Sequence, residues 1–205
     1  MNKQLISQEQ QMRDDFNLFW NQFMKNSQPV DYYGMLSPEQ LIGLKKVLSD
    51  VNNIITMRVT LEFAKTLLNN QIINPVQYCE ICRTIRSKGP NCNGFDVEYD
   101  GSKIQIVAEV KCNIPESSAG FKGNQITHIK CDINNLQKGK SKSKIKNIKN
   151  AYKFFVLLDD GQYVTQAMNN LIYLKNWGNI IKDITQFNPN DRNSIYLVYI
   201  PINSI

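Results

Sequence analysis

Apolar residues recur at helical spacing near the start of the chain. Within residues 8–26 the large apolar side chains fall on one side of a helix, which predicts an amphipathic helix with a single apolar face. These residues are Met12, Phe16, Phe19, Trp20 and Phe23. We expect this face to be buried in the protein core.

A second helix is predicted to begin at residue 38. Ser37 supplies an N-cap, Pro38 suits the first helical turn, and Gln40 completes a capping box. The apolar positions that follow at helical spacing are Leu41, Leu44, Leu48, Met57, Leu61 and Leu68. The helix either continues through residues 52–53 or breaks there and restarts. Residues 1–72 are therefore expected to form a helical flank.

The pattern changes after Asn74-Pro75, where β-favouring and alternating segments begin. Residues 78–85 favour a strand. Residues 94–99 and 103–111 flank Asp100-Gly101, a dipeptide typical of the tight turn between two antiparallel strands. A β-hairpin is therefore predicted at this point.

The rest of the chain predicts alternating helices and strands. The expected elements are a helix at 124–136, a lysine-rich loop at 138–144, a buried strand at 154–158, a helix at 165–175 and a closing strand at 195–200. This order predicts an α/β fold, with a central mixed sheet of four or five strands and helices on both faces. We expect a single domain in which residues 73–205 form the α/β core.

Composition and charge favour an anionic partner such as nucleic acid. The 205 residues include 24 Lys and Arg against 18 Asp and Glu, giving a net charge of +6 and a pI near 9.0. The odd number of cysteines, five, and the lack of an apolar run at the start predict an intracellular setting with reduced thiols. No stretch has the run of apolar residues that a membrane span needs.

Several classes of chemistry are excluded by what the sequence lacks. It contains neither a GxxxxGK[ST] phosphate loop nor a GxGxxG turn, so a nucleotide cofactor is not expected. His128 is the single histidine, which excludes mechanisms that need two imidazoles. Any catalysis must therefore use carboxylates, lysines or thiols.

Polar side chains of the predicted hairpin gather on one face and at one end. Asp96 opens the first strand, while Glu109 and Lys111 close the second, so all three lie away from the turn. Two carboxylates can hold Mg²⁺, which polarises a phosphate and lowers the pKa of a bound water. A lysine can orient or deprotonate that water. The arrangement predicts phosphodiester hydrolysis.

The motif Gly-Phe-Asp96 followed by Ala-Glu109-Val110-Lys111 resembles the PD-(D/E)XK nuclease superfamily, with Phe95 in place of the usual proline. The resemblance covers about residues 90–138. It implies that Asp96 and Glu109 bind Mg²⁺, with the Val110 carbonyl as a further ligand, and that Lys111 handles the attacking water.

The small size and the helical flank look most like type II restriction endonucleases. This resemblance implies a restriction-endonuclease-like fold, cleavage of double-stranded DNA at a short site, a homodimer, and the cytoplasm of a prokaryote. Members of the superfamily often recruit a metal-binding glutamate from a preceding helix, for which Glu62 is the natural candidate.

Other interpretations of the hairpin stay open. The same site suits a repair, recombination or mobile-element nuclease that acts on structured DNA. A non-catalytic DNA-binding protein, or a surface hairpin with solvated charges, is a third interpretation. Glu98 or Asp100 could also replace Asp96 in its role.

The remaining candidates concern zinc and DNA contact. Cys79-x-x-Cys82 and His128-x-x-Cys131 have zinc-ligand types, but Cys79 and Cys82 would point to opposite faces of the expected strand, which favours free thiols. The residues expected to contact DNA are Lys122, Gln125, Lys138, Lys140, Lys142 and Lys144. Lysines neutralise phosphates, whereas a solvated loop is the alternative for the lysine run.

Overall fold

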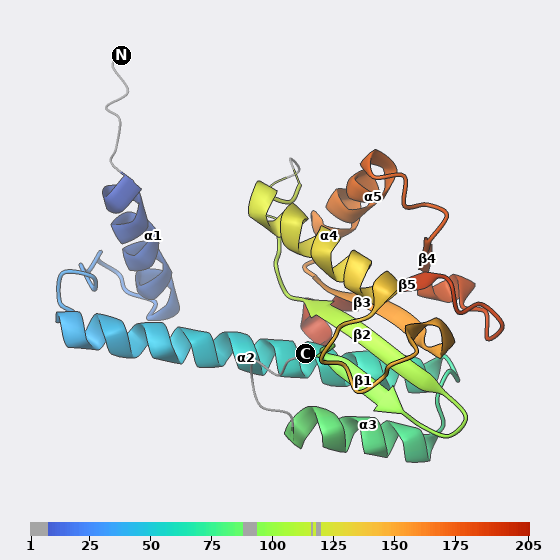
Figure 1. Cartoon of the computed structure of the whole chain (residues 1–205). Helices are drawn as coiled ribbons and strands as arrows, with labels where there is room; N and C mark the ends of the chain where they lie inside the picture. The colour runs from blue at the N-terminus through green and yellow to red at the C-terminus, as the bar shows by residue number, and fades with distance from the viewer. Residues whose placement is uncertain (1–7, 88–93, 116, 118–119) are drawn as a thin grey trace. The chain divides into compact units, whose positions relative to one another are not determined.

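The computed structural model describes residues 8–87, 94–115, 117 and 120–205 (Figure 1). The helices are α1 (Gln8–Phe23), α2 (Pro38–Asn69), α3 (Pro75–Ser87), α4 (Gly123–Lys138) and α5 (Val164–Leu174). The strands are β1 (Val97–Asp100), β2 (Gln105–Lys111), β3 (Tyr152–Asp159), β4 (Ile181–Asp183) and β5 (Ile195–Pro201). Short 3₁₀ turns lie at Ile148–Asn150, Ile184–Gln186 and Ile202–Ser204.

Contacts within the chain divide it into an N-terminal unit, Met1–Val51, and a C-terminal unit, Asn52–Ile205. The long helix α2 crosses this boundary. The division falls at Val51 and not near residue 72, because the second half of α2 buries its apolar side chains against the sheet. Each unit is therefore described by itself.

The C-terminal unit is built on a five-stranded mixed sheet with the order β1-β2-β3-β5-β4. The β1–β2 pair is antiparallel, with Val97 opposite Ala108, and the other neighbouring pairs are parallel. The α4 connection lets β3 run parallel to β2, as parallel pairing requires a crossover. The predicted α/β class with a mixed sheet is confirmed.

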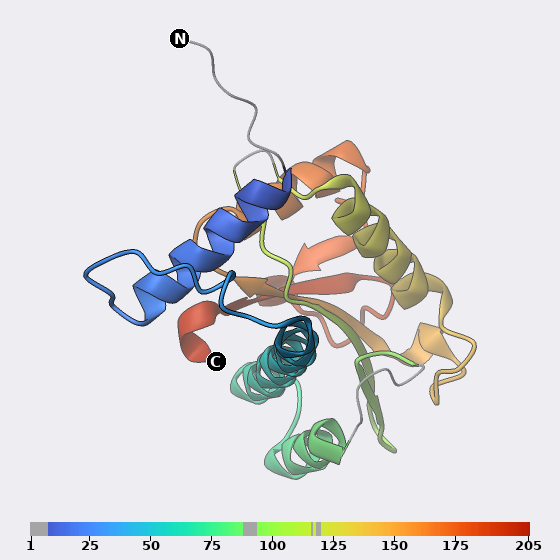
Figure 2. The same cartoon turned by 90° about the vertical axis from the view of Figure 1, so that its left-hand side faces the viewer.

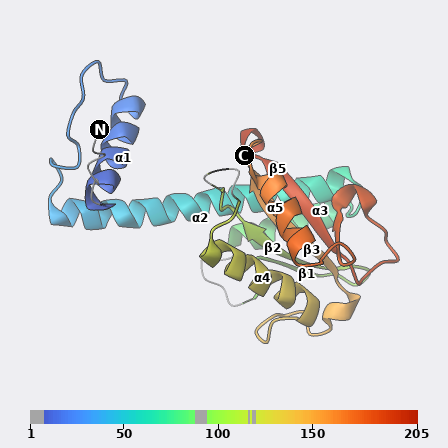
Figure 3. The same cartoon turned by 90° about the horizontal axis from the view of Figure 1, so that it is seen from above.

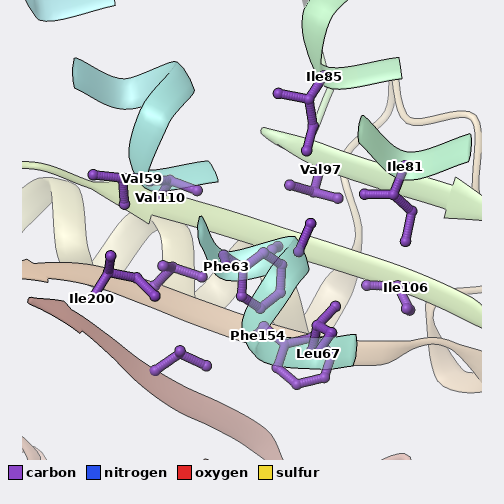
Figure 4. Close-up of a cluster of buried hydrophobic side chains, with 14 of the residues drawn as sticks. Val59, Phe63, Leu67, Ile81, Ile85, Val97, Ile106, Val110, Phe154 and Ile200 are labelled. Atoms are coloured by element: carbon purple, nitrogen blue, oxygen red, sulfur yellow. The ribbon is translucent and has the colours of Figure 1, made fainter. Parts of the chain in front are cut away.

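Helices cover both faces of the sheet (Figures 2 and 3). On one face, α2 and α3 bury Phe63, Leu67 and Ile81 against Ile106 and Phe154. Figure 4 shows this packing, in which the rings of Phe63 and Phe154 lie 5.3 Å apart between centroids. Each large side chain buried in this way contributes about 1.5–3 kcal/mol to folding.

The opposite face is covered by α4 and α5. Their apolar residues pack with Val107 of β2 and with Phe155 and Leu157 of β3. Because side chains alternate across a strand, Glu109 and Lys111 share the face of Val107. The candidate catalytic residues therefore lie on the α4 side of the sheet.

The N-terminal unit consists of α1, the loop that follows it and the first part of α2. Asn21 of α1 donates a hydrogen bond from Nδ2 to the Val30 carbonyl and accepts one from the Val30 N–H, both 2.8 Å long. The expectation that the apolar face of α1 is buried is wrong. Met12, Phe19 and Phe23 are 61%, 59% and 66% exposed.

One predicted strand is a helix. Residues 78–85 belong to α3, because Asn74 and Gln77 form a reciprocal cap in which each side chain accepts a hydrogen bond from the other's backbone N–H. Pro75 occupies the first helical position, where its missing N–H costs nothing. A short apolar run does not by itself distinguish a strand from a buried helix, and the cap decides between them.

The other predictions for the C-terminal unit are confirmed with shifted ends. The helices at 124–136 and 165–175 are α4 and α5, and the strands at 154–158 and 195–200 are β3 and β5. The helix from residue 38 continues through residues 52–53 without a break. The short edge strand β4 was not predicted. Among the described helices, none combines the length and hydropathy that crossing a lipid bilayer requires.

Candidate active site

Asp96 lies one residue before β1 and contacts the end of β2. Its Oδ2 accepts a hydrogen bond of 2.7 Å from the backbone N–H of Val110. This bond fixes the carboxylate beside the two residues that flank Val110 on the strand. The hairpin thus brings Asp96, Glu109 and Lys111 together, as the sequence predicts.

Glu109 is an acid in an almost completely buried position. It is 2% exposed, and burial, together with the nearby Asp96 carboxylate, raises the pKa of Glu109 to about 8. The ammonium of Lys140 opposes this shift, with Nζ 2.5 Å from Oε1 of Glu109. A buried carboxylate that needs a cation to remain ionised is a suitable metal ligand.

Lys111 is paired with an acid from α4. Its Nζ lies 2.7 Å from Oδ2 of Asp132, a residue that is itself buried. Burial alone would lower the pKa of Lys111, but the carboxylates of Asp132, Asp96 and Glu109 together outweigh it and raise that pKa. The lysine is therefore held as a cation in a fixed position.

Lys140 reaches into the site from the loop after α4. Besides contacting Glu109, its Nζ donates a hydrogen bond of 2.8 Å to the Gly94 carbonyl and lies 5.2 Å from the centre of the Phe95 ring. These contacts orient the side chain inward. Lys140 was predicted as a DNA-contacting lysine, and the structure places it on Glu109, the candidate catalytic carboxylate.

A pocket of about 420 Å³ opens beside Lys111. Its walls come from the segment after β2 and from the first turns of α4. The residues that line it include Asn113, Phe121, Asn124, Gln125 and His128. Volumes of 300–1,000 Å³ are typical of sites for small ligands or parts of larger ones. Lys111 is therefore accessible from a pocket whose walls carry the side-chain amides of Asn113, Asn124 and Gln125.

The structure does not bring Glu62 to this group. Glu62 lies on α2 and forms an ion pair of 2.8 Å with Lys65, whereas Glu109 points to the α4 side of the sheet. A helical acid is recruited to the site, but it is Asp132 on α4. Its contact is to the lysine and not to Glu109.

The two alternatives to Asp96 have other contacts. Glu98 accepts hydrogen bonds from the backbone N–H groups of Phe95 and Lys144, at 3.1 and 3.4 Å. Asp100 accepts a bond of 2.7 Å from Gln105 near the hairpin turn. Both acids support the hairpin and its neighbouring loop.

The cysteine and histidine candidates are not brought together. Cys79 and Cys82 lie on α3, and His128 and Cys131 lie on α4, which covers the opposite face of the sheet. Within the described part of the chain, no group of three or more His, Cys, Asp or Glu side chains is placed to hold a metal ion.

The donor set at the hairpin fits magnesium chemically. Mg²⁺ is commonly held by one or two carboxylates and keeps several waters, so a full protein cage is not required. Asp96 and Glu109 would provide those carboxylates, and the buried Glu109 is the group whose charge a cation would compensate. The role of the Val110 carbonyl as a further magnesium ligand stays a prediction.

The other residues expected to contact DNA lie around this site. Lys122 precedes α4, where its backbone N–H donates a 2.8 Å bond to Oε1 of Gln125. Lys138 ends α4. In the following loop, Lys142 and Lys144 are exposed, while the residues between and beside them, Ser143 and Ile145, are buried. The lysine run is therefore an anchored loop in which Lys142 and Lys144 are directed outward, whereas Lys140 is directed inward to Glu109.

Two residues of the site were missed by sequence reasoning alone. Asp132 falls between Ile129 and Ile133 on the apolar side of α4, and an acid within an apolar helical stripe indicates a buried partner. That pattern could have revealed Asp132. Nothing in the sequence distinguishes Lys140 from the neighbouring lysines.

Comparison with known proteins identifies no relative. No family model matches the chain, and no curated protein or solved structure shows significant similarity to it.

Proposed function

We propose that this protein is a magnesium-dependent endonuclease that hydrolyses phosphodiester bonds of double-stranded DNA at a specific site, as a type II restriction enzyme does. Its fold is proposed to be restriction-endonuclease-like. The observation that supports the proposal most is the convergence of Asp96, Glu109 and Lys111 at one end of the β1–β2 hairpin.

Each residue has a distinct task in this proposal. Asp96 and Glu109 hold the magnesium ion, which, when bound, polarises the scissile phosphate and lowers the pKa of a coordinated water. Lys111 orients the attacking water and offsets negative charge as the phosphate is attacked. Asp132 positions Lys111 through their 2.7 Å ion pair.

The charge distribution supports a polyanionic substrate. The C-terminal unit carries nineteen basic against twelve acidic residues, and the N-terminal unit carries five against six. The excess positive charge thus belongs to the unit that contains the site. Lys142 and Lys144 are exposed on the loop that also carries Lys140, and in this proposal they contact phosphates of the DNA.

The test is incubation of purified protein with phage or plasmid DNA in Mg²⁺ or in EDTA, followed by mapping of the ends. We expect discrete fragments that require Mg²⁺. Lys111→Ala should slow cleavage at least about 100-fold, the usual scale for losing a group that stabilises charge in the transition state, while sparing DNA binding. Lys103→Ala, which removes an exposed lysine between β1 and β2, is the matched control and should cut normally.

Two other outcomes would indicate a different function. Cleavage of flaps and junctions without cleavage of plain duplex would indicate a repair or recombination nuclease. DNA binding without Mg²⁺-dependent cleavage of any of these substrates would indicate a non-catalytic DNA-binding protein, in which Lys111→Ala changes nothing.

A further inference from the structure

The N-terminal unit exposes an unusually large amount of apolar surface to solvent. None of residues 10–51 is buried. Ten large apolar side chains in this stretch are between 42% and 71% exposed. Each side chain has an area of roughly 150 Å², of which somewhat more than half is exposed, so the ten together present roughly 900 Å² to solvent. The largest contiguous apolar patch on a typical monomer is about 300–600 Å².

The exposed residues form stripes along both helices. On α1, Met12, Phe19 and Phe23 are seven and four positions apart, which places them on one side of the helix. On α2, the half-buried Leu41 and Leu44 are followed by the exposed Leu48 and Val51, at successive spacings of three, four and three. That alternation is the heptad pattern of helices that pack against another helix through a continuous seam.

A hollow of about 280 Å³ lies within the same unit. The residues that line it are all apolar or aromatic, among them Phe16, Trp20, Met24, Met35 and Leu44. A concave apolar site beside protruding Phe and Met side chains can accept the same kind of side chain from another surface. The N-terminal unit thus has both the knobs and the hole of a self-complementary interface.

The charge of this unit argues against nucleic acid as its partner. Its five basic and six acidic residues leave it slightly negative, in contrast to the basic C-terminal unit. This slightly negative unit does not attract a phosphate backbone or an anionic membrane. An apolar surface with balanced charge suits a protein partner instead.

We propose that the N-terminal unit is a dimerisation arm, which packs against the same arm of a second copy of this chain. The exposed area is close to the about 800 Å² that each partner contributes to a standard-size interface. A twofold arrangement places the α2 seam of one copy against that of the other. This inference is independent of the proposed nuclease activity.

The test is the mass of the full-length protein in solution, measured by sedimentation velocity from about 1 to 100 μM, a range that spans micromolar dissociation constants. We expect a dimer of twice 23.6 kDa. The double variant Leu48→Glu/Val51→Glu should raise the dissociation constant at least about tenfold, because it puts charge into the seam. Leu174→Glu, at an apolar position that is 70% exposed on α5, is the matched control and should remain a dimer.

A second measurement guards against misfolding of the double variant. In the wild-type protein, hydrogen exchange in α1 and in residues 38–51 should slow as the concentration rises through the dimer transition. A wild-type monomer at every concentration overturns the proposal, whatever covers the arm. A dimer that survives the double substitution also overturns it, since the interface would lie elsewhere. Neither result depends on whether the protein cuts DNA.

Discussion

Nζ of Lys140 lies 2.5 Å from Oε1 of the buried Glu109. A lysine ammonium and a magnesium ion cannot occupy the same position on this oxygen, so Lys140 must withdraw from it when a metal binds there. Lys140 lies on a loop whose other lysines face outward, where a phosphate could attract it. Binding of DNA and binding of metal would then favour each other.

Replacement of Lys140 by methionine should increase the affinity of the free protein for Mg²⁺. The variant keeps an aliphatic chain but removes the competing positive charge. We expect the association constant for Mg²⁺ to rise about tenfold, a change on the scale of one ion pair. Calorimetric titration at pH 9 measures this while limiting protonation of Glu109. Lys142→Met, at an exposed lysine of the same loop, is the control. Unchanged or weaker Mg²⁺ binding by Lys140→Met would show that the lysine does not compete.

The pKa of about 8 for Glu109 predicts a specific dependence of stability on pH. In the unfolded chain this carboxyl titrates near its ordinary value, so between that value and pH 8 the folded state holds a proton that the unfolded state has released. Stability from this group is therefore present at low pH and is lost as pH rises, by up to about 1.4 kcal/mol for each pH unit.

Glu109→Gln should remove this contribution. We expect the free energy of unfolding of the variant, relative to wild type, to increase steadily from pH 5 to pH 8 in metal-free buffer. Denaturant titrations across this range measure it. Glu80→Gln, which changes an exposed acid on α3, is the matched control. A constant difference between Glu109→Gln and wild type would mean that Glu109 is ionised throughout.

The hairpin was predictable because its information is local. Alternation of polar and apolar residues on either side of Asp100-Gly101 fixes the register, and the register places Asp96 beside Val110. The contacts of Lys111 and Lys140 were not predictable in the same way. Each depends on how α4 and the following loop lie over the sheet, which is a result of packing between distant segments.

The errors at α1 and at residues 78–85 have a common physical origin. Local pattern shows that a surface is apolar, but it does not show what covers it. The face of α1 was assigned to the core of the same chain, yet Phe19 and Phe23 are exposed. The β-favouring, alternating residues at 78–85 predict a strand, but they do not show what the segment packs against, and the Asn74 cap makes it a helix.

Asp132→Asn should impair catalysis through Lys111. The substitution keeps the shape of the side chain but removes the charge that contributes most to raising the pKa of Lys111. We expect cleavage to slow by about 10- to 100-fold, as for residues that orient catalytic groups. The alkaline limb of the pH–rate profile should also move to lower pH, an effect that a purely structural role would not produce. Asn134→Ala, at an exposed position of α4, should leave the profile unchanged.

Lys142 and Lys144 should contribute to DNA affinity through phosphates alone. Both are exposed on a loop that buried Ser143 and Ile145 hold in place, so their removal should not disturb the fold. Each phosphate contact releases about one counterion, and Lys142→Ala/Lys144→Ala should therefore reduce the slope of log affinity against log salt by roughly two. Fluorescence anisotropy of a labelled duplex in EDTA, from low to moderate salt, gives the slope. Lys45→Ala/Lys46→Ala removes two exposed lysines of α2 and is the matched control. An equal loss of slope in both double variants would mean that DNA senses only the total charge of the protein, whereas a loss confined to the loop variant would locate the path of the phosphate backbone beside Lys140 and Glu109.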